Sequence, residues 1–397
     1  MSRLNRRGFL KTGITGAAGI LAFSPAIASG KTAQQGKNIT FRTLGKTGIK
    51  VPVVSFGVMR ADNPNLCKAA YEQGITLFDT ANGYQNGNNE VMLGNLLKNY
   101  PRKSFILETK VKPAGVDRDG RPTGQTTSAD FLAKFQTSLK RLQMDYVDIL
   151  YIHDVRNPEL LEYKPITDAI KKLKKEGKTK FIGFSTHANM PSVINTAADS
   201  KAWDVILTSY NFKLDNIPEM DAALKKANDA GIGLIAMKTI AGGGFLDKER
   251  TKPINSTSAI KWALSNTNIH TAIPGMTAFD QLDLNVKIME DIRMSDQEKK
   301  DILIASAEQS MFCTGCSKCT HACPKNLPVP DLMRAYMYAY GYSDTKRAYQ
   351  LLAELKTGSS PCTNCQTCLV SCTNNFKVRE KIADISRLVN VPVDFIV

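Results

Sequence analysis

Eight cysteines near the end of the chain fall into two runs with the same spacing, and that spacing can bind iron. The first run, "CTGCSKCTHACP", covers residues 313–324, and the second, "CTNCQTCLVSC", covers residues 362–372. Three thiols at intervals of three residues, followed by a fourth, form the pattern that ligates [4Fe–4S] clusters. The sequence therefore predicts two [4Fe–4S] clusters, which transfer single electrons. The predicted ligands are Cys313, Cys316, Cys319, Cys323, Cys362, Cys365, Cys368 and Cys372.

Disulfide bonds and zinc are the alternative uses of these cysteines. An oxidising compartment favours disulfides, but two short identical runs would give strained local bridges. Zinc sites usually take two separated pairs of ligands, whereas three thiolates at i, i+3 and i+6 wrap around a cubane. Iron–sulfur binding is the strongest of the three interpretations. Cys67 stands alone in a helical pattern and is expected to be a buried apolar side chain.

The two runs are expected to share their clusters. In two-cluster ferredoxins, which these runs resemble, the fourth cysteine of each run ligates the other cluster. By this resemblance one cluster is held by Cys313, Cys316, Cys319 and Cys372, and the other by Cys362, Cys365, Cys368 and Cys323. The segments 329–340 and 345–356 between the runs have helical patterns, so the resemblance is to an α-helical ferredoxin module.

Four ionisable side chains farther upstream could carry out acid–base chemistry. Asp79 ends one apolar run and is followed by Tyr84, while Lys110 and His153 end the next two runs. A lysine cation beside a phenol, held in turn by a carboxylate, lowers the pKa of the tyrosine, and a histidine can orient a carbonyl oxygen. Each residue alone has an ordinary explanation, such as a helix cap or a core histidine. Together they predict a proton-transfer site.

Strands and helices alternate around these side chains. Apolar runs begin near residues 51, 75, 104, 145, 180, 203, 232 and 269. Helical patterns follow at 64–73, 89–98, 128–142, 158–176, 189–199, 216–230, 256–266 and 278–289. Eight such units predict an α/β fold, a parallel sheet closed into a (β/α)₈ TIM barrel. Because the carboxyl ends of barrel strands meet at one end, the four side chains are expected to lie together there.

This region resembles the aldo-keto reductase superfamily. The resemblance rests on "FDTANGY", "LETKV", "DYVDILYIHD" and the opening "FRTLGKTGIKVPVVSFG", and it covers roughly residues 40–292. The family's catalytic tetrad falls on Asp79, Tyr84, Lys110 and His153. In the family the tyrosine protonates the carbonyl oxygen while a nicotinamide cofactor delivers hydride to the carbon. The resemblance therefore implies interconversion of a small carbonyl compound and its alcohol.

The expected nucleotide pocket departs from the family's pattern. Ser185 is kept after the fifth strand, but Thr186 replaces an asparagine. Met237 stands where members often carry a tyrosine that stacks on the nicotinamide, and Leu207 stands in place of a glutamine. These differences weaken the expected contacts to the nicotinamide.

The 2′-phosphate contacts are weakened as well. Gly275 and Gln281 occupy positions where a lysine and an arginine often hold that phosphate, so NADPH loses charge-assisted contacts. The glycines of "AGGGF" at 241–245 could bring backbone N–H groups to a pyrophosphate or form a plain loop. NAD(P)H stays an expected cofactor. Its predicted binding residues are Gly57, Val58, Met59, Ser185, Met237, Gly242, Gly243, Pro274, Gly275 and Asn285.

The first residues resemble a twin-arginine export signal. "NRRGFLK" at 5–11 precedes a weakly apolar stretch that ends in small residues at 26–28. This pattern predicts export to the periplasm, with a basic tail as the alternative. The predicted organisation is a signal at 1–28, a linker at 29–39, the barrel at 40–294 and the iron–sulfur domain at 295–397.

Composition and charge exclude several classes of protein. The 397 residues are 43% hydrophobic and 22% charged, and no stretch after the signal is long and apolar enough to span a bilayer. The net charge of +15 is spread along the chain, and the basic run at 171–180 reads as a solvated helix face. A nucleic-acid partner is therefore not predicted, whereas an acidic redox partner or an anionic membrane surface stays open.

These features support one preferred hypothesis and two others. The preferred one is an exported oxidoreductase that acts on a small ketone, aldehyde or alcohol and exchanges electrons, through its clusters, with a redox partner protein or a quinone-linked carrier. The second is an electron-transfer subunit whose barrel is a docking scaffold. The third gives the clusters only a structural role. The loop at 112–126 is longer than a typical βα connection and is expected to help set specificity.

Overall fold

The structure is a computed structural model that describes residues 38–247 and 249–396. The predicted export signal and nearly all of the predicted linker lie outside the described residues. None of the helices within those two ranges combines the length and the apolar character that crossing a membrane requires.

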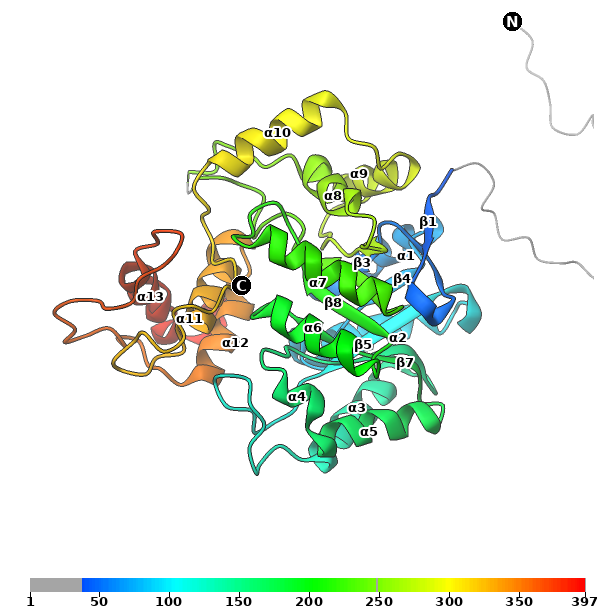
Figure 1. Ribbon diagram of the computed structural model, residues 1–397, viewed down its shortest axis with the longest axis horizontal. Helices are drawn as coiled ribbons and strands as arrows, with labels where there is room; N and C mark the ends of the chain where they lie inside the picture. Colours follow the sequence, from blue (N-terminus) through cyan, green and yellow to red (C-terminus); the bar gives the residue numbers. More distant parts are fainter. Residues whose placement is uncertain (1–37, 248, 397) are drawn as a thin grey trace, which may run out of the picture. The chain divides into compact units, whose positions relative to one another are not determined.

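Eight parallel strands form a closed barrel (Figure 1). Each strand pairs with the next in chain order from β3 to β10. The sheet closes where Val54 pairs with Ala272 and Gly57 pairs with Gly275. The predicted (β/α)₈ barrel is therefore confirmed. The strands are β3 (Phe56–Gly57), β4 (Leu77–Asp79), β5 (Ile106–Val111), β6 (Val147–Ile152), β7 (Thr179–Thr186), β8 (Val205–Ser209), β9 (Gly233–Met237) and β10 (Thr271–Ala272).

The run predicted as the first strand divides into two elements. Its first part belongs to β2 (Lys50–Pro52), which pairs antiparallel with β1 (Phe41–Thr43) in a separate hairpin. Only its last two residues join the barrel, as β3. A change of pairing partner within one apolar run leaves no signal in the periodicity, which is the same for both pieces.

Amphipathic helices cover the barrel as the apolar periodicity predicts. In α3 (Ser128–Leu142), Thr127 caps the first turn by accepting a hydrogen bond from the backbone N–H of Asp130, and Phe131 and Phe135 bury one face. The other barrel helices are α1 (Pro64–Glu72), α2 (Asn88–Leu97), α4 (Glu159–Glu162), α5 (Lys164–Lys175), α6 (Met190–Ser200), α7 (Ile217–Asp229), α8 (Ser256–Ser265) and α9 (Phe279–Glu290). The helix predicted at 158–176 divides into α4 and α5, because Pro165 has no N–H and favours the first turn of a new helix.

The cysteine-rich end of the chain forms a small helical domain with its own core. Helix α11 (Val329–Tyr336) continues into a π-helical turn, η5 (Met337–Gly341), and packs on α12 (Thr345–Leu355) and α13 (Val378–Ser386). The predicted α-helical module is thus confirmed. Its core is formed by Phe312, Val329, Leu332, Met333, Ala335, Tyr336, Met337, Tyr338, Ala348, Leu351, Leu352, Phe376, Val378, Ile382 and Ile385.

Helix α10 (Asp296–Ala307), which the sequence assigns to the second domain, packs on the barrel instead. Its Glu298 forms an ion pair of 2.9 Å with Lys261 of α8. Ile302 and Ala305 bury their side chains with Phe212 in a cluster on the barrel. The cysteine-rich domain therefore begins after this helix.

The second domain lies over the carboxyl-terminal end of the barrel. The barrel loops that follow strands β5, β6, β8 and β9 are among those that contact it. The contacts are Arg118 to His321 at 2.8 Å, Arg156 to Asp331 at 2.6 Å, Asp215 to Thr373 at 3.2 Å and Arg250 to Ser343 at 2.7 Å. Since active sites of such barrels lie at this end, the second domain covers the predicted site.

Candidate active site

The four predicted acid–base residues lie at the carboxyl ends of three neighbouring strands. Asp79 is the last residue of β4, and Tyr84 begins the short turn that follows it. Lys110 is next to last in β5, and His153 follows β6 directly. Neighbouring parallel strands bring these ends together. The structure therefore gathers all four side chains at one end of the barrel.

Lys110 stands at the centre of this group. Its ammonium nitrogen lies 2.5 Å from Oδ1 of Asp79 and 2.7 Å from the carbonyl oxygen of Thr80. The same nitrogen lies 3.4 Å from the hydroxyl of Tyr84. The Tyr84 and His153 rings meet edge to face, with centroids 5.8 Å apart. A buried carboxylate thus holds a cation against a phenol, as the residue types predicted.

The protonation states differ from the expectation in one respect. Burial raises the pKa of Tyr84 to about 12, and the Lys110 ammonium offsets only part of that shift. The sequence predicted a lowered pKa, because the lysine is visible in the sequence and the burial is not. Burial and the charge of Lys110 hold the pKa of His153 well below its usual value. At neutral pH the site presents a protonated phenol and a neutral imidazole.

Sequence reasoning missed a second acid beneath the site. Glu108 is fully buried, and Tyr151 donates a hydrogen bond of 2.8 Å to its carboxyl group. Burial and the nearby charge of Asp79 raise the pKa of Glu108 well above its usual range, so Glu108 carries a proton. Burial also raises the pKa of Asp79, and Lys110 together with the neighbouring Glu108 offsets part of that shift. The available signal was its position two residues before Lys110, which places both side chains on one face of the strand.

The eight cysteines line two cavities. One cavity is lined by Cys313, Cys316, Cys319 and Cys372, and the other by Cys323, Cys362, Cys365 and Cys368. Each set contains three thiols of one run and the last thiol of the other. Within the two described ranges, no three His, Cys, Asp or Glu side chains converge closely enough to hold a single metal ion. Each cavity is thus lined by four thiols, the ligand set that a [4Fe–4S] cluster takes.

Comparison with known proteins agrees with this geometry. The aldo/keto reductase family matches residues 57–259, and the 4Fe-4S dicluster domain matches residues 312–377. The chain is 30% identical over 305 residues to the L-galactose dehydrogenase of Arabidopsis thaliana, which is 66% of this chain and 92% of that relative. The chain belongs to the aldo/keto reductase family. This aldo/keto reductase is an oxidoreductase that carries a C-terminal ferredoxin domain with eight cysteines.

One further relative and one solved structure are similar to this chain. The L-glyceraldehyde 3-phosphate reductase of Escherichia coli is 25% identical over 322 residues, which is 66% of this chain and 91% of that relative. A solved aldo-keto reductase of Bacillus halodurans superposes with a TM-score of 0.55 at 22% identity, over 69% of this chain and 99% of that protein. The structural likeness supports the barrel fold.

Several residues that the sequence predicts to bind a nucleotide contact other parts of this aldo/keto reductase instead. The hydroxyl of Ser185 accepts a hydrogen bond of 3.0 Å from the backbone N–H of Asp154. Met59 packs against the core of the second domain. A side chain on Gly242 would meet Phe312 at 3.2 Å, and one on Gly243 would meet the backbone of Gly341 at 2.7 Å. The glycines thus allow close approach of the second domain, and nucleotide binding stays a prediction.

The other predicted nucleotide residues serve the barrel. Gly57 and Gly275 pair where the barrel closes, and Pro274 accepts a hydrogen bond of 3.3 Å from the N–H of Gly57. Val58 and Asn285 are buried. Met237 packs with Leu207 and other apolar side chains of a separate core cluster. No cation stands at position 275 or 281 to hold a 2′-phosphate.

The second domain also forms part of the surroundings of the tetrad. Tyr338 lies close enough to Tyr84 to help raise its pKa, and Tyr84 in turn helps raise the pKa of Tyr342. Arg347 of α12 acts electrostatically on both Tyr84 and His153. These three residues follow the first cysteine run, so the sequence did not connect them with the barrel. The active site and the cysteine-rich domain form one structure.

Proposed function

We propose that this aldo/keto reductase interconverts a small carbonyl compound and its alcohol, with its clusters linking the reaction to an external electron carrier. The observation that carries the proposal is the position of the Lys110 ammonium, 2.5 Å from Asp79 and 3.4 Å from the Tyr84 hydroxyl. Relatives named L-galactose dehydrogenase and L-glyceraldehyde 3-phosphate reductase support an aldehyde or hydroxyl group on a sugar-like molecule as the substrate.

In this proposal Tyr84 is the general acid for reduction. Its hydroxyl is protonated at neutral pH, because burial raises its pKa to about 12. The hydroxyl gives its proton to the carbonyl oxygen of the substrate, and the Lys110 ammonium stabilises the phenolate that forms. Neutral His153 orients the carbonyl oxygen. Alcohol oxidation runs through the same groups in reverse.

The two cysteine sets would hold the electron-transfer groups. When bound, two [4Fe–4S] clusters would supply two electrons for each carbonyl group reduced, and a second proton from solvent, besides the one from Tyr84, would complete the new C–H bond. Thr373, beside the ligand Cys372, donates a hydrogen bond of 3.2 Å to Asp215 of the barrel and so fixes this end of the run against the enzyme domain. Export by the twin-arginine route to the periplasm, and a redox partner protein or quinone-linked carrier as the electron exchanger, belong to the proposal.

Turnover by cluster-loaded protein tests the proposal. Aldoses, aldehydes, ketones and alcohols are supplied in turn with nicotinamide, viologen and quinone couples, and product is measured. We expect turnover with at least one couple, and its loss in Tyr84→Phe. Absence of product with every couple would contradict the proposal.

A second candidate function is an electron-transfer subunit whose barrel is a docking scaffold. The packing of Gly243 against Gly341 favours it, because the second domain then occupies a predicted nucleotide position. The scaffold function requires that no nucleotide and no substrate bind. Fluorescence titration of the loaded protein with NAD⁺ and NADP⁺, together with the turnover panel, separates the two functions.

A further inference from the structure

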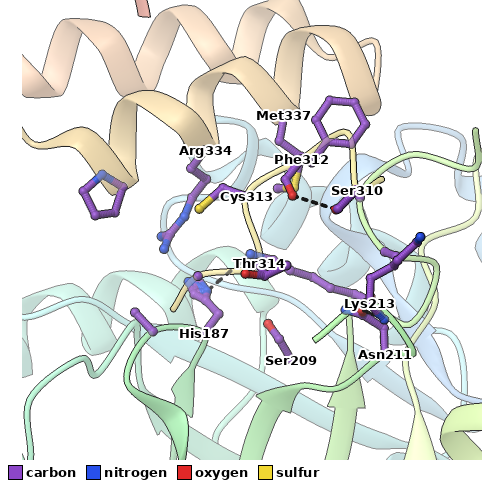
Figure 2. Close-up of a pocket in the computed structure, with 16 residues that line it drawn as sticks. His187, Ser209, Asn211, Lys213, Ser310, Phe312, Cys313, Thr314, Arg334 and Met337 are labelled. Atoms are coloured by element: carbon purple, nitrogen blue, oxygen red, sulfur yellow. Dashed lines mark hydrogen bonds between the residues drawn. The ribbon is translucent and has the colours of Figure 1, made fainter. Parts of the chain in front are cut away.

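A cavity lies between the barrel and the second domain, beside the cluster ligand Cys313 (Figure 2). His187, Ser209 and Lys238 line it from the barrel, and Cys313 and Arg334 line it from the other domain. The volume open to the centres of water-sized spheres is about 50 Å³, which leaves room for a few water molecules or one small ligand. The tetrad is not among its lining residues. The residues that line this cavity therefore differ from those of the proton-transfer site.

Two polar groups in this cavity have few partners of their own, the buried hydroxyl of Ser209 and the half-buried amine of Lys238. The hydroxyl of Ser209 is buried and has no hydrogen-bond partner within residues 38–247 and 249–396, and in Figure 2 it points into the space between His187 and Thr314. No ion pair joins the ammonium of Lys238 to a carboxylate in the same ranges, and its nearest polar contact is Nδ1 of His187 at 3.5 Å. Buried polar groups without partners are uncommon, and they mark places where a ligand supplies the partner.

The charge around the cavity is positive. Arg334 is 3.4 Å from Asp154, but that carboxylate is already shared with Arg156 at 2.6 Å and with Lys112 at 3.4 Å. Asp331 pairs with Arg156 as well. Two carboxylates thus serve three ion-paired cations. Lys238 adds a further amine, whose pKa burial and the charge of Arg334 lower to about 7, and a bound anion would favour its charged form. An anion would balance this excess.

The contacts next to the cavity favour a small ligand over a dinucleotide. Gly242 and Gly243, whose N–H groups would be expected to face a pyrophosphate, lie against Phe312 and Gly341. The cluster-binding run closes another side, since a side chain on Gly315 would meet the carbonyl oxygen of His187 at 2.4 Å. These contacts narrow the space beside the glycines, which favours a compact molecule beside Ser209 and Lys238 over an extended nucleotide.

We propose that this cavity binds a small organic acid, whose carboxylate is held by the ammonium of Lys238 and the hydroxyl of Ser209. A carboxylate accepts hydrogen bonds from both groups and supplies the charge that the cavity lacks. The ligand lies beside Cys313, so a bound acid also alters the surroundings of the adjoining cluster. The proposal needs neither the tetrad nor turnover, and it stands apart from the function proposed above.

Calorimetric titration of the cluster-loaded protein tests this site without any measurement of activity. The probes are lactate and pyruvate, with lactamide and pyruvamide as neutral counterparts of the same shape. We expect the acids to bind and the amides to bind about tenfold or more weakly, because a charge-assisted hydrogen bond is lost. Lys238→Met should weaken the acids by a similar factor, and Ser209→Ala by less. Lys171→Met, on the exposed face of α5, is the control and should bind as the parent does.

Location of the ligand is tested separately. We expect lactate to change the electron paramagnetic resonance spectrum of the reduced parent and to leave that of Lys238→Met unchanged. If Lys238→Met fails to load clusters, Ser209→Ala carries the test, because it removes one oxygen atom. The proposal would be overturned if acids and amides bound with equal affinity, or if both variants bound the acids as tightly as the parent does. Binding of NAD⁺ to this cavity without binding of the acids would also overturn it.

Discussion

Arg156 and Asp331 form a two-pronged ion pair that joins the barrel to the cysteine-rich domain. Nη1 of Arg156 lies 2.8 Å from one carboxylate oxygen and Nη2 lies 2.6 Å from the other. The side chains are only 15% and 8% exposed, so water screens the pair weakly. Because Arg156 follows β6 and Asp331 belongs to α11, this pair fixes α11 over the end of the barrel. The position of the second domain therefore depends on a few buried charges.

Asp331→Asn should destabilise the protein. The substitution leaves the Arg156 cation buried with one carboxylate, Asp154, in place of two. Removing one partner of a buried pair costs about 3 kcal/mol, at the lower end of the usual range, because Asp154 remains. Thermal unfolding followed by circular dichroism measures the change. Asp229→Asn removes an exposed pair with Lys225 and is the control, with no measurable shift expected. Equal midpoints for both variants would show that the pair does not hold the domains.

The contribution of Asp331 should disappear in acid. Burial alone would raise the pKa of Asp331, but the hydrogen bonds and charge of Arg156 outweigh it and lower the pKa. The folded pKa then lies below the unfolded value of about 3.9, so the stabilisation is complete above about pH 4 and is lost as the pH falls through the folded pKa. The difference in midpoint between the parent and Asp331→Asn should be full at pH 7 and shrink below about pH 4. A difference that is unchanged in acid would contradict this electrostatic account.

Carbonyl reduction should depend little on pH around neutrality. Burial raises the pKa of Tyr84 to about 12, so the acid form needed for reduction persists until strongly alkaline pH. Alcohol oxidation requires the phenolate and should therefore speed up as the pH rises. Tyr84→Phe should lower kcat/KM about 10²–10⁴-fold, the usual contribution of a general acid. Tyr71→Phe is the control and should leave the rate unchanged. The hydroxyl of Tyr71 lies outside the site and donates a hydrogen bond of 2.7 Å to Ser104. A reduction rate that falls with a midpoint near pH 7 would exclude Tyr84 as the acid.

Amide substitution should affect activity little at Glu108 and strongly at Asp79. Glu108 carries a proton, because burial and Asp79 raise its pKa well above its usual range. Glu108→Gln replaces one neutral donor with another and should retain most of the activity. Asp79→Asn removes the charge that lies 2.5 Å from Lys110 and should abolish activity. Steady-state kinetics of the two variants decide the matter, and equal losses would mean that Glu108 is charged in the working enzyme.

Local patterns foretold much of this fold and little of its assembly. The helix predicted at 64–73 is observed as Pro64–Glu72, because apolar spacing and capping act within a few turns. Asp79, Lys110 and His153 could be placed together because parallel strands align their ends. Cys67 lies in the buried core, as its helical pattern indicated.

Contacts between distant segments could not be predicted in this way. Arg156 and Asp331 are 175 residues apart, and nothing in either neighbourhood marks the other. Gly242 lies in a glycine run that suggests a phosphate loop, but the side where a Cβ atom would stand faces Phe312. Part of the raised pKa of Tyr84 has the same origin, because Tyr338 of the domain that follows contributes to it. Such features depend on how the two domains meet, which periodicity does not report.

Single cysteine substitutions should remove clusters in a crossed pattern. Cys372 shares a cavity with Cys313, Cys316 and Cys319, although it belongs to the second run. Cys372→Ser should therefore impair the same cluster as Cys313→Ser, and Cys323→Ser the same cluster as Cys362→Ser. Each variant should keep about four of the eight iron atoms of two [4Fe–4S] clusters.

Iron content and electron paramagnetic resonance of the reduced variants measure this pattern. The spectra of Cys372→Ser and Cys313→Ser should match each other and differ from that of Cys362→Ser, because a different cluster survives. Cys67→Ser, a substitution in the barrel core far along the chain from both runs, is the control and should keep the full iron content. A Cys372→Ser spectrum that matches that of Cys362→Ser would mean that each run holds its own cluster. The four thiols that line each cavity would then not be the ligands of one cluster.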